Sequence, residues 1–139
     1  MFSESGGQCK MKKGYQQYKK TSVESASREK LLLLMYEGAI KYIKRAIIAI
    51  DNKDIAGRGM NIGRAFDIVM ELNNTLNHDV ASDIAKNLEQ LYMFVTDQLT
   101  QANIHGDKKY LEDALKIVTT LHEGWVVAVS KIKKEEQSR

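Results

Sequence analysis

The sequence SREKLLLLMYEGAIKYIKRAIIAID, residues 27–51, carries the clearest helical pattern in this chain of 139 residues. Its apolar residues recur at alternating steps of four and three, which places them along one face of an α-helix. They are Leu32, Tyr36, Ala39, Ile43, Ala46 and Ile50. Ser27 can cap the helix by accepting a backbone N–H, and Glu29 suits the positive end of the helix dipole. The pattern therefore predicts a long amphipathic helix from Ser27 to Asp51.

Three further stretches show the same alternation and predict helices over about residues 56–77, 82–104 and 108–133. Asp107 precedes the last of them and is its expected N-cap. The connections are short, which favours antiparallel neighbours, and the seams suit bundle packing at a crossing angle of about 20°. The chain contains no proline, which also favours helices over a strand-rich fold. We therefore expect an all-α protein, an antiparallel up-down four-helix bundle.

The ends of the chain differ from the middle in composition. Residues 1–14 are polar, glycine-bearing and basic, so we expect a disordered basic tail there. Residues 15–133 should form a single bundle domain that includes a short N-terminal capping segment, and residues 134–139 should fray. Because the whole chain carries a formal charge of +3 and residues 1–20 carry +4, the remaining residues sum to −1. The high isoelectric point is therefore weak evidence for nucleic-acid binding.

Signals for export or membrane insertion are missing from the sequence. No stretch reaches the roughly 18 uninterrupted apolar residues of a membrane span, and the N-terminus lacks the apolar core of a signal peptide. The single cysteine, Cys9, cannot form an internal disulfide, which fits a reducing compartment. We expect a cytoplasmic protein without membrane insertion.

The sequence does not encode the chemistry of known helical-bundle enzymes. A carboxylate metal site in a bundle needs a glutamate three residues before a histidine, and that position holds threonine or alanine before all three histidines. The glycines at 57, 59 and 63 lack the Gly-Lys-Ser/Thr ending of a phosphate loop. We expect no enzyme activity, no metal and no cofactor.

Two functions from other classes fit parts of the sequence. A histidine phosphotransfer bundle would use His122, the only histidine in the interior of a predicted helix. A nucleic-acid-binding helical module would use the basic tail, since residues 15–20 mix tyrosines with lysines as single-strand binders do.

The predicted helices carry more apolar residues than their packing seams require. A bundle helix needs about three apolar positions in seven, yet residues 126–129 cover nearly the full circumference of the last helix. Met93 and Phe94 widen the apolar face of the third helix, and Phe66 and Met70 that of the second. Large exposed apolar patches mark partner sites, and grooves between helices accept amphipathic helices. The surplus predicts a partner site, or else packing of the N-terminal segment or of a second copy.

The first helix also resembles the signature of a known family. The run SASREKLLLLMYEGAI at residues 25–40 is similar to that of the flagellar secretion chaperone FliS. The family's pattern continues in Arg64-Ala65 with Ile68, Glu71 and Leu72, in Asn87-Leu88 with Leu91-Tyr92, in Leu99 with Ala102-Asn103, and in Leu121 with Trp125. Tyr15-Gln-Gln-Tyr18 matches the family's N-terminal tyrosine segment, so the resemblance covers about residues 15–130. The family usually has proline where Arg28 stands, a first helical position at which proline is favoured but not required.

This resemblance implies a cytosolic export chaperone that uses no ATP. The family binds the disordered C-terminal segment of flagellin, which wraps the bundle and becomes partly helical. Binding prevents premature polymerisation and aids delivery of flagellin to the flagellar type III export apparatus. Flagellar export components and other flagellar regulators are further partners to be expected.

Within this hypothesis, particular residues are expected to contact flagellin. Tyr15 and Tyr18 would form a movable N-terminal cover that flagellin displaces. The expected walls of the flagellin groove are Ile68, Leu72, Leu91, Tyr92 and Val95. Trp125 is expected in the core, and Arg64 and Glu71 are expected to form a polar pair on the second helix or a solvated face.

Overall fold

In the computed structural model, the backbone is described for residues 6–79 and 82–138. Side chains are described for residues 28–79 and 83–137. The chain divides into two compact units, residues 1–31 and the remainder from Leu32 to Arg139. The first unit provides the N-terminal part of one helix, and the second unit holds a bundle.

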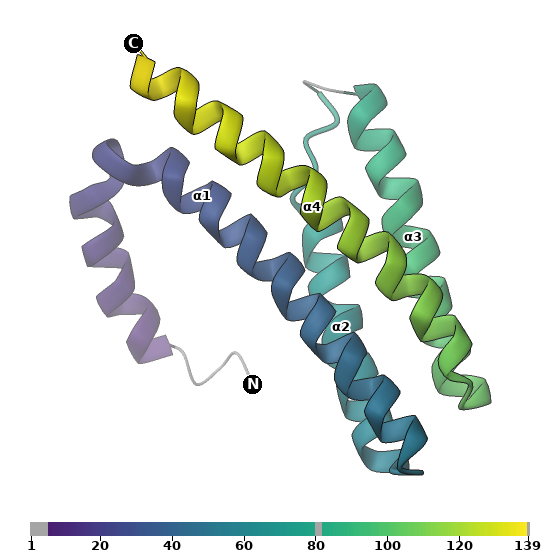
Figure 1. Cartoon of the computed structure of the whole chain (residues 1–139). Coiled ribbons are helices and arrows are strands. Elements are labelled where there is room, and N and C mark those ends of the chain that lie inside the picture. Colours follow the sequence, from purple (N-terminus) through teal and green to yellow (C-terminus); the bar gives the residue numbers. More distant parts are fainter. Residues whose placement is uncertain (1–5, 80–81, 139) are drawn as a thin grey trace. The chain divides into compact units, whose positions relative to one another are not determined.

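The described backbone is helical apart from short connections. The helices are α1 Gly6–Asp51, α2 Ile55–Asn74, α3 Ser82–His105 and α4 Lys108–Ser138 (Figure 1). The predicted boundaries of α2 and α3 agree with these to within a few residues. Helix α1 begins at Gly6 rather than near Ser27, and α4 continues past residue 133, since no proline interrupts either sequence.

The predicted division of the chain stays a prediction: a disordered tail at residues 1–14, a bundle domain at residues 15–133 and a frayed end at residues 134–139. Helical backbone from Gly6 lies within the proposed tail at residues 1–14. The side chains of Tyr15 and Tyr18 lie outside the described residues, so their role as a cover is also still a prediction.

The α1–α2 connection is closed by an aspartate cap. Asp54 has extended backbone, and its Oδ1 accepts the backbone N–H of Gly57 at 2.9 Å. This bond satisfies one of the donors left free in the first turn of α2. A short capped connection brings the two helices side by side in opposite directions.

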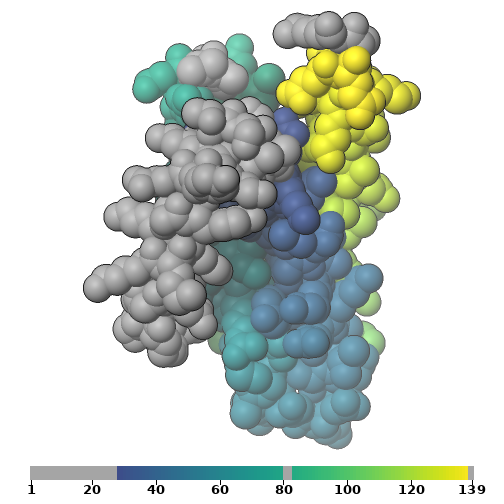
Figure 2. Space-filling model, turned by 90° about the vertical axis from the view of Figure 1, so that its left-hand side faces the viewer, coloured from purple at the N-terminus to yellow at the C-terminus, as the bar shows by residue number. Residues whose placement is uncertain are grey.

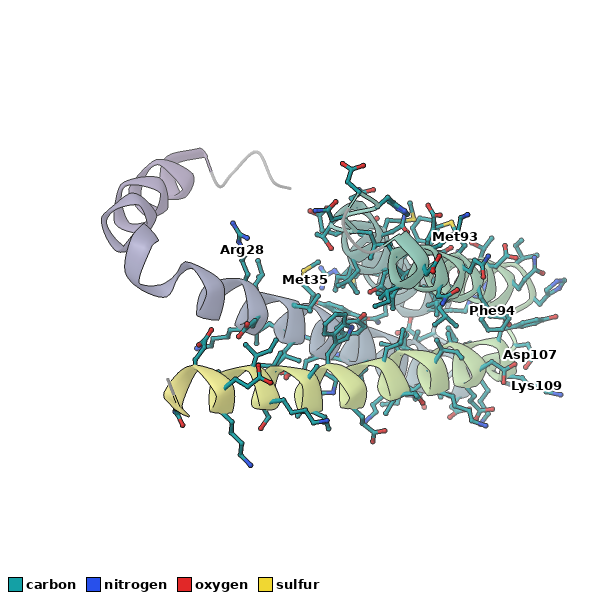
Figure 3. The ribbon with its side chains drawn as sticks, turned by 90° about the horizontal axis from the view of Figure 1, so that it is seen from above. Arg28, Met35, Met93, Phe94, Asp107 and Lys109 are labelled. Atoms are coloured by element: carbon teal, nitrogen blue, oxygen red, sulfur yellow. The ribbon has the colours of Figure 1, made fainter. Side chains whose placement is uncertain are left out.

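The α3–α4 connection uses one glycine and one aspartate. Gly106 has φ of +64°, and its N–H donates to the carbonyl of Ala102 at 2.8 Å, which ends α3 in a left-handed cap. Asp107 Oδ1 accepts the N–H of Lys109 at 2.9 Å, so the predicted N-cap of α4 is confirmed. Figure 3 labels Asp107 and Lys109 at this end of the bundle.

A single hydrophobic core lies between the four helices of the second unit. Its buried members come from all four: Tyr36, Ala39, Ile43 and Ala46 of α1, Ile62, Ala65, Val69 and Leu72 of α2, Tyr92, Val95, Leu99 and Ala102 of α3, and Leu111, Ala114 and Val118 of α4. The α1 members are the face expected from the sequence. The predicted all-α four-helix bundle is confirmed.

Helix α4 packs antiparallel to the part of α1 that belongs to the bundle. Lys108 Nζ lies 2.9 Å from Asp51 Oδ1 at one end, and His122 Nε2 lies 3.4 Å from Glu37 Oε2 about four turns further along. Figure 2 shows the side chains of α1 and α4 in contact along this seam. Helix α3 packs against both α2 and α4, so the helices surround the core in chain order.

Candidate partner-binding surface

A small polar network crosses the core beneath the surface of the bundle. Tyr36 of α1 and Tyr92 of α3 are hydrogen-bonded through their hydroxyls, and Trp125 Nε1 of α4 donates to Tyr36 Oη at 3.0 Å. Burial raises the pKa of Tyr36, and burial together with the hydrogen bond to Tyr36 raises the pKa of Tyr92. Both tyrosines are therefore neutral at physiological pH, and they tie three helices together. Trp125 packs against the core, as predicted.

Three of the residues expected to line a groove belong to this core. Leu72 and Val95 are fully buried, and Tyr92 is only 3% exposed. They have the spacing of an apolar helical face, but the facing helices cover their side chains. These side chains can support a binding surface from beneath, but in the free chain they do not form one.

The other two expected groove residues are half-buried and lie on different sides of the bundle. Ile68 of α2 points to α1, where its Cδ1 would be 3.2 Å from a Cβ added at Gly38. Leu91 of α3 is half-buried and lies one turn before the exposed Phe94. The structure therefore does not bring the five residues together on one open surface.

Exposed apolar side chains do line α3 on the side that faces α2. Met93 is 40% exposed and Ile104 is 65% exposed, and helical spacing places them three turns apart on one flank. Between α2 and α3 lies an open pocket of about 280 Å³. It is lined by Gly59, Ile62, Gly63, Phe66, Asp67, Thr100, Asn103 and Ile104. We call this side of the helix, with Met93, Ile104 and the pocket, the α2 flank of α3.

The opposite side of α3, which faces α4, is also apolar on the outside. Phe94 is 44% exposed and lies three turns before His105, whose ring stacks on Tyr110 of α4 with centroids 5.8 Å apart. Leu91 lies on the same side. Half-buried Ile117 and Leu121 of α4 pack against the core there. We call this the α4 flank of α3, and Figure 3 labels Met93 and Phe94 on the two flanks.

Other expected polar features are placed differently by the structure. Arg64 and Glu71 do not form the expected pair, because the Arg64 guanidinium lies over the ring of Tyr42, 5.5 Å from its centroid. His122, the residue of the phosphotransfer alternative, has a mostly buried side chain beside Glu37. Among the residues whose side chains are described, no three His, Cys, Asp or Glu cluster as a metal site would require. No helix in the described part combines the length and apolarity of a bilayer span.

Sequence reasoning missed the hydrogen bonds of the polar network and the burial of Thr96. Tyr36, Tyr92 and Trp125 each fall on an apolar seam, and only their hydroxyl and N–H groups signal a possible buried bond. Nothing in the sequence shows which of the seam positions find each other across helices.

The fold and these surfaces define a class, a helical bundle that has a complete core and also carries exposed apolar side chains, among them those on both flanks of α3. A family model described as flagellar protein FliS matches residues 11–132. The flagellar secretion chaperone FliS of Vibrio cholerae is 36% identical over 83% of this chain and 88% of its own length. The Bacillus subtilis protein of the same name is 31% identical over 87% of this chain and 90% of its own.

A solved structure shows the same fold. The crystal structure of a flagellar chaperone from bacteria matches with a TM-score of 0.73 at 18% identity, covering 86% of this chain and 97% of that one. The chain belongs to the FliS family of flagellar secretion chaperones, which are not enzymes.

Proposed function

We propose that this chain binds the C-terminal segment of flagellin in the cytoplasm, prevents its premature polymerisation and aids its delivery to the flagellar type III export apparatus. The observation that carries the proposal is the family match over residues 11–132. The exposed apolar flanks of α3 support it, because an export chaperone needs surface that a disordered client can cover.

The flagellin segment would lie along α3 and contact both flanks. Met93, Ile104 and Phe94 would be its direct apolar contacts, with Leu91 at the margin of the α4 flank. Burying the exposed part of one such side chain contributes about 1 kcal/mol. Several together offset the cost of ordering a disordered segment, about 2–5 kcal/mol or more.

The residues that the sequence predicts as the walls of the flagellin groove also have roles in this proposal. Leu72, Tyr92 and Val95 would hold the outer flanks in position from the core side. Ile68 would contact the client only if the segment also reached the α1 side of α2. Tyr15 and Tyr18 would form the cover that the client displaces.

Co-purification with full-length flagellin, compared with flagellin lacking its C-terminal segment, tests the proposal. The full-length protein should be retained at equal stoichiometry with the chaperone, and the truncated protein should not. Equal retention of both forms would contradict the proposed client segment.

A further inference from the structure

A cluster of positive charges surrounds one tyrosine on the seam between α1 and α2. Lys41 Nζ lies 4.7 Å from the centroid of the Tyr42 ring, and Arg45 Cζ lies 5.8 Å from it. The third cation comes from the neighbouring helix, with Arg64 Cζ at 5.5 Å. The three charged side chains are exposed, whereas Tyr42 is half-buried against the core. We call these four residues the Tyr42 basic cluster.

The charges of this cluster are not neutralised within the described residues. None of the three cations there forms an ion pair with a carboxylate, in contrast to Lys108, which lies 2.9 Å from Asp51. Glu71, expected to pair with Arg64, lies two helical turns away, about 10 Å along the axis. Contact with the ring gives each exposed cation only about 0.5–1 kcal/mol. Like charges therefore meet around the ring without an ion pair to any described carboxylate.

The cluster is built on two helices, α1 and α2, and shares no residue with the flanks of α3. Lys41 and Arg45 are one turn apart on α1, and Arg64 comes from α2, so two helices supply the cations around one ring. Arginine binds carboxylates through two parallel N–H bonds, and two arginines on opposite helices can hold two carboxylates of one segment. The half-buried ring offers an apolar contact between them.

The surroundings decide which kind of anion fits. Residues 21–139 sum to −1, and exposed Glu37 and Asp67 lie one turn from Lys41 and Arg64 on their own helices, so the basic cluster is local. A nucleic acid presents a long row of phosphates and is bound through many such charges. A local cluster on a nearly neutral body suits a short acidic segment of a protein instead.

We propose that the Tyr42 basic cluster is a second docking site, which binds an acidic segment of a protein partner through Arg45, Arg64 and Lys41 and packs one of its side chains on Tyr42. The site is independent of the α3 flanks, so the chain could hold its client and this partner at the same time. This inference rests on the geometry of the cluster and does not require the proposed flagellin contact.

Fluorescence anisotropy with a labelled peptide of glutamate, aspartate and leucine, titrated with the full chain, tests the site. The double substitution Arg45→Glu and Arg64→Glu should weaken binding at least about tenfold. The matched double substitution Lys109→Glu and Lys116→Glu changes the net charge equally on the exposed face of α4, and it should weaken binding less than about twofold. Tyr42→Ala, with the charges kept, should weaken it about threefold.

Three results would overturn the proposal. The peptide could fail to bind the wild-type chain at low salt, the two double variants could lose equal affinity, or an oligonucleotide of equal charge could bind the cluster more tightly than the peptide. Flagellin binding measured on the Arg45→Glu, Arg64→Glu variant should stay at the wild-type level, and this also shows that the variant is folded. Loss of flagellin binding in that variant would contradict the independence of the two sites.

Discussion

Helix α3 presents two kinds of apolar surface that are one residue apart in sequence. Tyr92 is 3% exposed and its hydroxyl is hydrogen-bonded, whereas the next residues, Met93 and Phe94, are 40% and 44% exposed. The other three helices pack against the inner face of α3. No described residue buries the outer flanks to the same degree. The difference teaches that apolar character alone does not separate stability from binding. Substitutions on the inner face should alter folding, and those on the outer flanks should alter affinity.

The largest effect is expected for truncation of a core leucine of α3. Leu99→Ala removes a fully buried side chain and leaves a cavity, so the free energy of unfolding should fall by about 2–5 kcal/mol. Ile104→Ala on the α2 flank is the matched control, and because Ile104 is 65% exposed it should change stability by less than about 0.5 kcal/mol. Urea denaturation followed by circular dichroism measures both. Equal losses would remove the distinction between the two surfaces.

A smaller effect is expected from the polar network. Tyr36→Phe leaves Trp125 Nε1 and the Tyr92 hydroxyl without their partner in the core, which should cost about 1–3 kcal/mol. The control is Tyr110→Phe, since the Tyr110 hydroxyl has no hydrogen bond to any described residue. It should change stability by less than about 0.5 kcal/mol. If the two variants unfold at the same urea concentration, the buried bonds contribute nothing measurable.

The network also makes stability depend on alkaline pH. Burial raises the pKa of Tyr36 and Tyr92 in the folded chain, so each loses its proton at lower pH when the chain is unfolded. The unfolded state then binds fewer protons above pH about 10, and stability must fall as pH rises further, by up to about 1.4 kcal/mol per pH unit for each tyrosine. Below that pH this contribution is fully present. Unfolding curves between neutral and strongly alkaline pH should show a shallower decline for Tyr92→Phe, and an unchanged decline would contradict the assignment.

The smallest effects on stability are expected at two glycines. Gly106→Ala places a side chain at φ of +64° and 2.5 Å from Arg58 Nη1, and should cost about 1–2 kcal/mol. Gly63→Ala on the open α2 flank meets nothing within 4 Å and should instead stabilise α2 by up to about 1 kcal/mol. Thermal unfolding of the two variants should shift in opposite directions. A loss of stability in Gly63→Ala would contradict the open space around residue 63.

Much of the bundle could be predicted from the sequence because helix periodicity is a local property. Alternating steps of three and four placed α2 and α3 correctly, and Asp107 was recognisable as a cap from its position alone. The start of α1 could not be predicted. Ser27 is a good N-cap, but the helix begins at Gly6, and the sequence has no proline that would prevent this earlier start.

The candidate site could be predicted only in part, because it depends on which helices face each other. Leu72, Tyr92 and Val95 have a helical spacing that core residues and groove residues share, and only the packed bundle shows that they are buried. The partner of Arg64 was expected on its own helix at Glu71 but lies across the seam at Tyr42. The apolar surplus at Met93 and Phe94, by contrast, was visible in the sequence, since those positions fall outside the seam of α3.

The most direct test of the account is the affinity of a flagellin C-terminal peptide for variants of α3, measured by isothermal titration calorimetry. The double substitution Met93→Ser and Phe94→Ser should weaken binding at least about tenfold, because about 1 kcal/mol is lost at each position. Ile48→Ser, at an α1 residue that is 57% exposed, is the control and should bind within about twofold of the wild type. A folded Met93→Ser, Phe94→Ser variant that binds the peptide as tightly as the wild type would contradict the claim that the outer flanks of α3 hold the client.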